Sequence, residues 1–278
     1  MSIITLTTDM GLKDHYVAVV KGAIYSQVPD ARIVDISHSI TPFDNSQTAF
    51  VLRHAYPEFP RGTVHLIGVN PEATGTSPHL VVRHDGQFFI GADNGIFPLI
   101  FDGMPQEAFE LTMKLEDDHA IFPLKNVFVK AAAHLLKGGT AEVIGRKTVH
   151  IKEMMSFRPA TDNLSIRGAV IYIDSYGNVV TNIARLQFQD LVKGQPFRIT
   201  FGRHSYDITT LSKSYGDVPQ GERLAFFGSS GHLEIALNKG VDGMGGGAAG
   251  LLGLHVNDPV RVELVLTPRA TPAPVPVG

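Results

Sequence analysis

The chain has 278 residues, which is enough for one large domain or two of modest size, and we expect two. Its 24 basic and 27 acidic residues give a net charge of -3 without a cluster of Lys and Arg, so a small molecule is favoured over nucleic acid or an anionic membrane as its partner. The lack of cysteine excludes disulfides and thiolate metal sites.

The first residues, MSIITLTTDMG, lack the basic start and the long apolar run of a signal peptide. No segment offers the roughly 18 uninterrupted apolar residues of a transmembrane helix. We therefore expect a soluble cytoplasmic protein with no membrane partner.

The first half of the chain alternates between strand and helix patterns. This alternation predicts an α/β domain over residues 1–157, with a mostly parallel sheet between helices. Strands are predicted at 2–9, 31–37 and 62–69, a strand pair at 79–92 that turns at Asp85-Gly86, and helices at 15–28, 47–57 and 126–139.

The pattern changes at the polar, proline-containing segment 158–165, which is typical of a linker. Short β-like runs with little helical signal follow, and they predict a small antiparallel β-barrel or sandwich over 166–268. The glycine-rich stretch 240–253 is predicted to be a flexible insertion, and the proline-rich residues 269–278 a disordered tail. The runs are 166–174, 178–183, 196–201, 204–211, 223–229, 232–238 and 258–266.

Ligands of open parallel sheets bind beyond the carboxyl ends of the strands, which directs attention to Asp9, His38 and the loop VNPEATGTSPH (69–79). The Asp9 carboxylate either accepts hydrogen bonds from vicinal hydroxyls, such as those of a ribose, or caps a helix, and Asp14 shares the capping alternative. His38 is either a base or ligand or, more commonly for a lone histidine, a structural residue. The other histidines lack metal-ligand spacing, so no metal site and no cofactor are expected.

Two bends of the second half carry further candidates. Asp174, Tyr176 and Asn178 gather around a glycine between two strand-like runs, where they either bind an amine and a base or form an Asx-type turn. Ser229 lies in GSSG, which either holds a carboxylate or makes a hairpin turn.

Six segments in order resemble the S-adenosylmethionine hydroxide adenosyltransferase family, which also contains the fluorinase and chlorinase enzymes. The resemblance covers about residues 3–266. The segments are TTDMGLKDHYVAVVKGAI, ARIVDISHSITPFD, FPRGTVHLIGVNP, ADNGIF, YIDSYGNVVTNI, and SYGDVPQGE followed by GSSGHLEIALNKG.

The resemblance implies an N-terminal α/β domain, a C-terminal β-barrel domain and a homotrimer with active sites at subunit interfaces, each between one N-terminal and one C-terminal domain. It implies that Asp9 holds the ribose hydroxyls and that Phe43 covers the ligand. Asp14, Asp174 and Ser229 would hold the methionine end, while Tyr176 and Tyr215 would flank the adenine and Asn178 would bond its edge.

The chain departs from the family in the residues that activate water. Family hydrolases are similar in an Asp-Arg-His set, but here Asn70 or Pro71 replaces the Asp, Ser77 or Pro78 the Arg, and Pro123 the His. The stretch 73–76 is similar to the halide-holding loop of the fluorinase, yet Leu124 stands where that enzyme has a serine.

We therefore expect an S-adenosylmethionine-cleaving enzyme that uses water to give adenosine and L-methionine. Glu72, Thr74, Thr76 and His79 are the candidates for positioning or deprotonating the water, unless they are only solvated loop side chains. The alternatives are a non-catalytic protein that binds or senses S-adenosylmethionine or a related adenosine compound and, less favoured, a halide-using enzyme.

Overall fold

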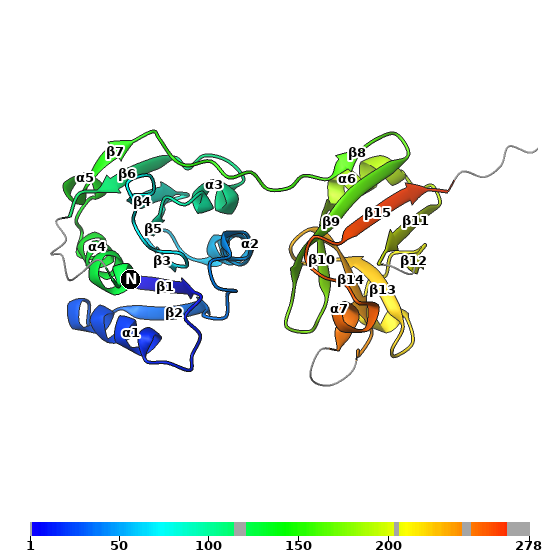
Figure 1. Ribbon diagram of the computed structural model, residues 1–278, viewed down its shortest axis with the longest axis horizontal. Coiled ribbons are helices and arrows are strands. Elements are labelled where there is room, and N and C mark those ends of the chain that lie inside the picture. The colour runs from blue at the N-terminus through cyan, green and yellow to red at the C-terminus, as the bar shows by residue number, and fades with distance from the viewer. Residues whose placement is uncertain (1, 114–120, 203–205, 241–245, 266–278) are drawn as a thin grey trace, which may run out of the picture. The chain divides into compact units, whose positions relative to one another are not determined.

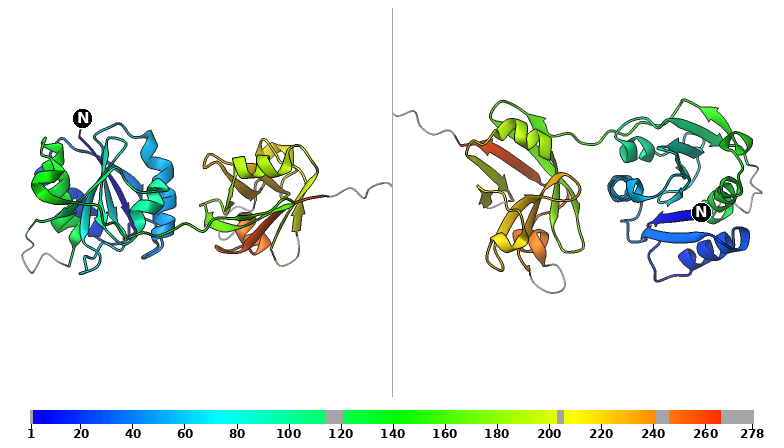
Figure 2. Two further views of the ribbon diagram at one scale, coloured as in Figure 1. Left: turned by 90° about the horizontal axis from the view of Figure 1, so that it is seen from above. Right: turned by 180° about the vertical axis from the view of Figure 1, so that it is seen from behind.

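The computed structural model describes residues 2–113, 121–202, 206–240 and 246–265, and it divides the chain into two compact units, Met1–Ser156 and Phe157–Gly278 (Figures 1 and 2). Each unit contains its own sheet and its own buried apolar cluster.

The first unit is built on a seven-stranded sheet in the order β2-β1-β3-β5-β4-β6-β7. The pairings of β2, β1, β3 and β5 are parallel and the remaining three are antiparallel, so the parallel part brings the carboxyl ends of its strands to one edge. The strands are β1 (Ile3–Thr8), β2 (Arg32–Ser37), β3 (Val64–Gly68), β4 (His79–His84), β5 (Gln87–Ala92), β6 (Glu107–Leu111) and β7 (Gly145–Thr148).

Helices cover both faces of this sheet. Helix α1 presents Val17, Val20 and Ile24 to the core at helical spacing and ends before Pro29. It packs beside α4, whereas α2 packs beside α3 over a separate cluster (Figure 1). The helices are α1 (Tyr16–Gln27), α2 (Asn45–Ala55), the 3-10 turn η1 (Tyr56–Glu58), α3 (Ile96–Phe101), the π-helical η3 (Leu124–Phe128), α4 (Val129–Leu136) and α5 (Ala141–Ile144).

The second unit is one antiparallel sheet in the order β12-β11-β15-β9-β10-β14-β13, with β8 paired to β9. Its outer strands are drawn together where Arg223 Nε donates to the Asp207 carbonyl at 3.2 Å and the Ser212 N–H donates to the Ala225 carbonyl at 2.8 Å. The sheet is therefore nearly closed into a barrel. Its elements are β8 (Ala160–Thr161), β9 (Ser165–Ile173), β10 (Val179–Ala184), α6 (Arg185–Val192), β11 (Phe197–Phe201), β12 (Tyr206–Ile208), the 3-10 turn η4 (Tyr215–Asp217), β13 (Arg223–Phe227), β14 (His232–Leu237), α7 (Gly247–Leu252) and β15 (Pro259–Leu264).

The predicted fold class is confirmed, but some local predictions are wrong. The predicted linker 158–165 contains β8 and the first residue of β9, because Ala160 and Thr161 pair with Arg167 and Ile166. The residues without regular secondary structure are instead 149–159.

Two helices of the second unit also contradict the predictions. No helix was predicted at Arg185–Val192, yet this segment forms α6 and buries Phe188, Leu191 and Val192 on one side. Helix α7 occupies part of the predicted flexible insertion, because Ala248 is buried in the barrel core. The predicted tail, 269–278, lies outside the described residues.

Candidate functional site

Asp9 directly follows β1, at the edge of the sheet where parallel strands end. Its Oδ2 accepts the backbone N–H of Phe43 at 3.0 Å, so the structure brings together two residues that are 34 positions apart. Phe43 has a φ of 65°, in the left-handed region that a bulky side chain rarely adopts, and its side chain is 72% exposed. A strained, exposed aromatic residue beside a carboxylate at a strand end is an arrangement found in ligand sites.

The helix-capping alternative for Asp9 and Asp14 is wrong. Helix α1 begins at Tyr16, its capping residue His15 makes no side-chain cap, and its first turn contains no acidic residue. Asp14 is instead exposed in the bend before the helix. Both carboxylates are therefore free of a helix-capping role.

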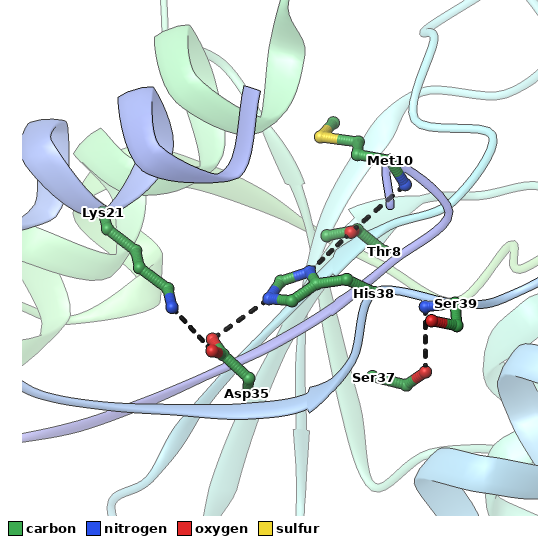
Figure 3. A network of polar contacts seen from close by, with 7 residues as sticks. All are labelled: Thr8, Met10, Lys21, Asp35, Ser37, His38 and Ser39. Atoms are coloured by element: carbon green, nitrogen blue, oxygen red, sulfur yellow. Dashed lines mark hydrogen bonds and ion pairs between the residues drawn. The ribbon is translucent and has the colours of Figure 1, made fainter. Parts of the chain in front are cut away.

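The structural alternative for His38 is confirmed, because its ring is buried in a polar network (Figure 3). Nδ1 lies 2.8 Å from Thr8 Oγ1, and Nε2 lies 3.1 Å from Asp35 Oδ1. Lys21 Nζ lies 2.6 Å from the other oxygen of Asp35. Burial opposes ionisation, but the contacts with Lys21 and His38 outweigh it and hold the pKa of Asp35 below its ordinary value.

The candidate nucleophile loop, residues 69–79, connects β3 with β4. Thr74 and Ser77 exchange backbone hydrogen bonds of 3.0 and 3.1 Å, which makes a tight turn, and the hydroxyl oxygens of Thr74 and Thr76 lie 3.3 Å apart at its exposed tip. Asn94 Nδ2 donates to the Asn70 carbonyl at 3.1 Å. The hydroxyls of Thr74 and Thr76 and the side chain of Glu72 are therefore exposed to solvent. The loop that carries them is fixed at its first residues by the hydrogen bond from Asn94.

His79 differs from the other three loop candidates because it is buried. Its Nε2 lies 2.8 Å from the carbonyl oxygen of Pro71, and its ring packs edge-on against Phe128. Burial lowers the pKa of His79, although the contact with Pro71 opposes the shift. A neutral ring that donates from Nε2 holds the two ends of the loop together, which is a structural role.

Two residues that the resemblance predicts to stand in place of family side chains are apolar and buried. Pro123 precedes η3, and Leu124 begins it with no exposed surface. A Cβ placed on Gly68 would lie 2.5 Å from Leu124 Cδ2 and 3.1 Å from Thr8 Cγ2, so the leucine fills the space against the ends of β1 and β3.

In the second unit, the bend between β9 and β10 is an Asx-type turn. Asp174 Oδ1 accepts the N–H groups of Tyr176 and Asn178 at 2.9 and 2.8 Å, and Oδ2 accepts Asn178 Nδ2 at 2.8 Å. Asn178 Nδ2 also lies 3.1 Å from Tyr215 Oη. Asp174, Asn178 and Tyr215 are thus one connected group, and Tyr176 extends from it with 83% of its surface exposed.

Ser229 lies in the hairpin turn between β13 and β14, which leaves its side chain exposed. Its neighbour Ser230 donates from Oγ to Glu234 Oε1 at 3.3 Å. Burial raises the pKa of Glu234, and the negative charge of Asp174 adds to the shift. Burial, together with Glu234 and Asp174, likewise raises the pKa of Tyr215.

Sequence reasoning missed Glu234 and Asp93. Glu234 interrupts the apolar run of β14, and an acid within a strand that is otherwise largely buried was the available signal. Asp93 is buried and accepts the Lys152 N–H on both oxygens at 3.0 and 3.1 Å, while burial raises its pKa. It lines a pocket of about 530 Å³ together with Thr76 of the nucleophile loop.

Within the described ranges, no three His, Asp or Glu side chains gather as a metal site. A search of the same ranges finds no helix long and apolar enough to cross a membrane.

The architecture and these polar strand ends define a class, an α/β unit with polar side chains at its strand ends followed by a β-barrel unit. The chain belongs to the S-adenosylmethionine hydroxide adenosyltransferase family, whose N-terminal domain model matches residues 4–145 and whose C-terminal domain model matches residues 168–261. The resemblance predicted from the sequence motifs is thereby confirmed.

Two kinds of curated relative match the chain. The (R)-S-adenosyl-L-methionine hydrolase of Thermus thermophilus is 31% identical over 92% of this chain and 97% of its own length. The fluorinase of Nocardia brasiliensis is 29% identical over 85% of this chain and 90% of its own length. A crystal structure of an uncharacterized conserved protein from Thermotoga maritima superposes with a TM-score of 0.81 at 30% identity, covering 94% of this chain and 99% of that one.

Proposed function

We propose that this protein cleaves S-adenosylmethionine with water, giving adenosine and L-methionine. The observation that carries the proposal is Asp9, a carboxylate at the end of β1 that lies against the N–H of an exposed aromatic residue, in a family with hydrolase relatives that match almost the whole chain. In this proposal Asp9 would hold the ribose hydroxyls and Phe43 would cover the ligand.

The second unit would supply the remaining contacts. Asp174 and Asn178 are held by their own turn and would meet the methionine amine and the adenine edge, with Tyr176 and Tyr215 flanking the base. Asp14 and Ser229 are both exposed and would complete the methionine end. We also propose the homotrimer that family membership implies, with each site at a subunit interface; light scattering of the purified protein tests the assembly, and a monomeric mass would contradict it.

The reaction needs little acid–base help. The water oxygen bonds to ribose C5′, the C5′–S bond breaks, its electron pair stays on sulfur as the neutral thioether of methionine, and the water loses a proton. Positioning the water can lower the activation barrier by on the order of 7–11 kcal/mol. A general base raises the rate by about 10²–10⁴-fold, which corresponds to roughly 3–5 kcal/mol of the barrier. A chain without the family's Asp-Arg-His set would therefore be slower without losing the reaction.

In the nucleophile loop, the exposed residues are suited to act on the water. Glu72 is titratable and exposed, and the Thr74 and Thr76 hydroxyls lie together at the turn. His79 is less suited because its Nε2 proton is donated to Pro71 and its ring is buried.

The experiment is turnover of purified protein with S-adenosylmethionine in water enriched in ¹⁸O. Adenosine should appear by chromatography, with one ¹⁸O at the 5′ oxygen in each molecule. Because the curated relatives are named for the (R) form, the two sulfonium epimers should be assayed separately. If neither epimer gives adenosine above the no-enzyme control, the proposal is wrong.

A second candidate is a binding protein that senses S-adenosylmethionine or a related adenosine compound without turnover. It is favoured by the structural role of His79 and by the apolar character of Pro123 and Leu124. Calorimetry would then give saturable binding, intact ligand would be recovered afterwards, and Asp9→Ala would abolish the binding.

A weaker candidate is transfer of a halide, for which the Thr74–Thr76 turn offers hydroxyls but Leu124 offers none. The absence of 5′-halo-adenosine in reactions with chloride or fluoride would remove it.

A further inference from the structure

His38 contacts the chain on both sides of Asp9 without being exposed itself. Its ring reaches back to Thr8, the residue before Asp9, and its carbonyl oxygen accepts the N–H of Gly11 at 2.8 Å, two residues after Asp9. We infer that His38, oriented by Asp35, is a positioning residue that sets the direction of the Asp9 carboxylate. The inference rests on the proposed function, in which Asp9 binds the ribose hydroxyls.

Figure 3 shows the contacts of the network, and the chemistry of each atom gives them one consistent direction of donation. Among the described residues, the only acceptor near Nε2 of His38 is the carboxylate of Asp35, at 3.1 Å. Because a carboxylate accepts, Nε2 carries the proton. When the ring carries this single proton, Nδ1 accepts from the Thr8 hydroxyl. Since the Thr8 proton is used in this way, its oxygen is left to accept the Met10 N–H, which lies 3.4 Å away.

This direction has a consequence for the loop after β1. The side chain of Asp35, held by Lys21, fixes the histidine tautomer, and with that tautomer the Thr8 hydroxyl donates to the ring while its oxygen accepts from the Met10 N–H. The two peptide groups that directly follow Asp9 therefore both bond to this network, the Met10 N–H through Thr8 and the Gly11 N–H to the His38 carbonyl. The same segment continues from His38 to Phe43, whose N–H donates to the Asp9 carboxylate.

The first unit contains a matched pair for comparison. Thr5, also on β1, lies with its Oγ1 2.7 Å from Nδ1 of the buried His65, whose Nε2 lies 2.7 Å from Gln87 Oε1. Both are threonine–histidine pairs with a further acceptor, and both are buried. Within the described part of the chain, none of the side-chain hydrogen bonds of the Thr5–His65 pair reaches the loop that carries Asp9. Breaking this pair by substitution therefore measures the general cost of losing a buried threonine–histidine contact.

The experiment compares Thr8→Val with Thr5→Val, which remove a hydroxyl at nearly constant shape. Calorimetry with full-length protein measures the affinity for adenosine and for 2′,3′-dideoxyadenosine, which lacks both ribose hydroxyls. Thr8→Val should weaken adenosine binding roughly 3- to 10-fold and change dideoxyadenosine binding less than about twofold. Thr5→Val should change both affinities less than about twofold.

Variants of His38 give a second readout. His38→Ala should raise KM for S-adenosylmethionine more than it lowers kcat, and His38→Asn, which keeps a polar atom near the place of Nδ1, should recover part of the loss. If His38→Ala fails to fold, the Thr8→Val comparison decides the inference.

The outcomes separate the inference from the proposed function. Wild-type protein that does not distinguish adenosine from dideoxyadenosine contradicts the ribose-binding role of Asp9 and the inference with it. Wild-type protein that distinguishes them, with Thr8→Val losing both affinities equally or behaving as Thr5→Val does, overturns the inference alone.

Discussion

Nε2 of His79 lies 2.8 Å from the carbonyl oxygen of Pro71, and because a carbonyl only accepts, the ring must donate its proton there. Nε2 therefore does not take a proton from water, and because His79 is only 6% exposed, the other ring nitrogen, Nδ1, has little access to solvent. His79→Gln should therefore lower kcat less than about 10-fold, whereas loss of a general base costs about 10²–10⁴-fold. Glu72→Gln should lower kcat more than His79→Gln does. Steady-state assays of adenosine formation check the order, and the reverse order would show that the histidine is the base.

Asp9 should control ligand affinity. Asp9→Ala removes a charged acceptor, and since hydrogen bonds to charged groups contribute about 1.5–3 kcal/mol, KM should rise roughly 10- to 100-fold. The control is Asp30→Ala, which removes an exposed carboxylate from the turn before β2 and should leave KM unchanged. Equal effects of the two substitutions would contradict a specific role for Asp9.

His65 should make stability depend on pH. Burial lowers its pKa from 6.5 to about 4, although its bond with Gln87 opposes the shift. The unfolded chain then binds the proton more readily than the folded chain, so the free energy of unfolding should fall as pH decreases from 6.5 towards 4, by up to about 3 kcal/mol. Urea unfolding at a series of pH values measures this, and His65→Gln should flatten the dependence in that window. An unchanged slope in the variant would assign the effect to other groups.

The charge of Asp174 should influence the titration of Glu234. Burial and the charge of Asp174 raise the pKa of Glu234, so Asp174→Asn should move that pKa back towards its ordinary value. A raised carboxyl pKa means that the folded state holds the proton more tightly, so this contribution to stability is present at low pH and is lost as pH rises through the folded-state pKa. Carboxyl ¹³C chemical shifts follow the titration directly; an unmoved midpoint in Asp174→Asn would show that burial alone is responsible.

Chelation should not affect activity or binding. Displacement from a sulfonium needs no Lewis acid, and the histidines of the sequence lack metal-ligand spacing. Activity before and after extensive treatment with EDTA should agree, and recovery of a lost activity by added divalent metal would contradict the prediction.

The sequence predicted the elements whose periodicity is uninterrupted. The apolar run before Asp9 and the helical spacing of Val17, Val20 and Ile24 correspond to β1 and α1. Helix α3 was not predicted, because Ile96–Phe101 is apolar at every position except Pro98 and therefore carries no helical period. The signal for α6 was present, since Phe188, Leu191 and Val192 recur at helical spacing, but it is only eight residues long.

The candidate site was predictable only in part. Motif order located Asp9 and Phe43, and the structure adds that their atoms meet across 34 residues. What a single sequence does not contain is which polar groups satisfy one another in three dimensions. The burial of His79 and the hydrogen bond between Asn178 and Tyr215 both depend on tertiary packing. The sequence alone therefore does not show that the side chains of His79 and Asn178 already have partners.

The two threonine–histidine pairs of β1 also specify how the sheet is assembled. Thr5 faces His65 directly in the β1–β3 ladder, and Thr8 meets His38 just beyond β2, on the other flank of the same strand. A shift of β1 by one residue against its neighbours would leave four buried polar groups without their partners, namely the hydroxyls of Thr5 and Thr8 and the rings of His65 and His38. Each such group costs about 1–3 kcal/mol when it is left without a partner. Apolar side chains alone would tolerate a mispaired sheet more readily, so these hydroxyl–imidazole contacts select a single strand alignment during folding and thereby fix where Asp9 emerges.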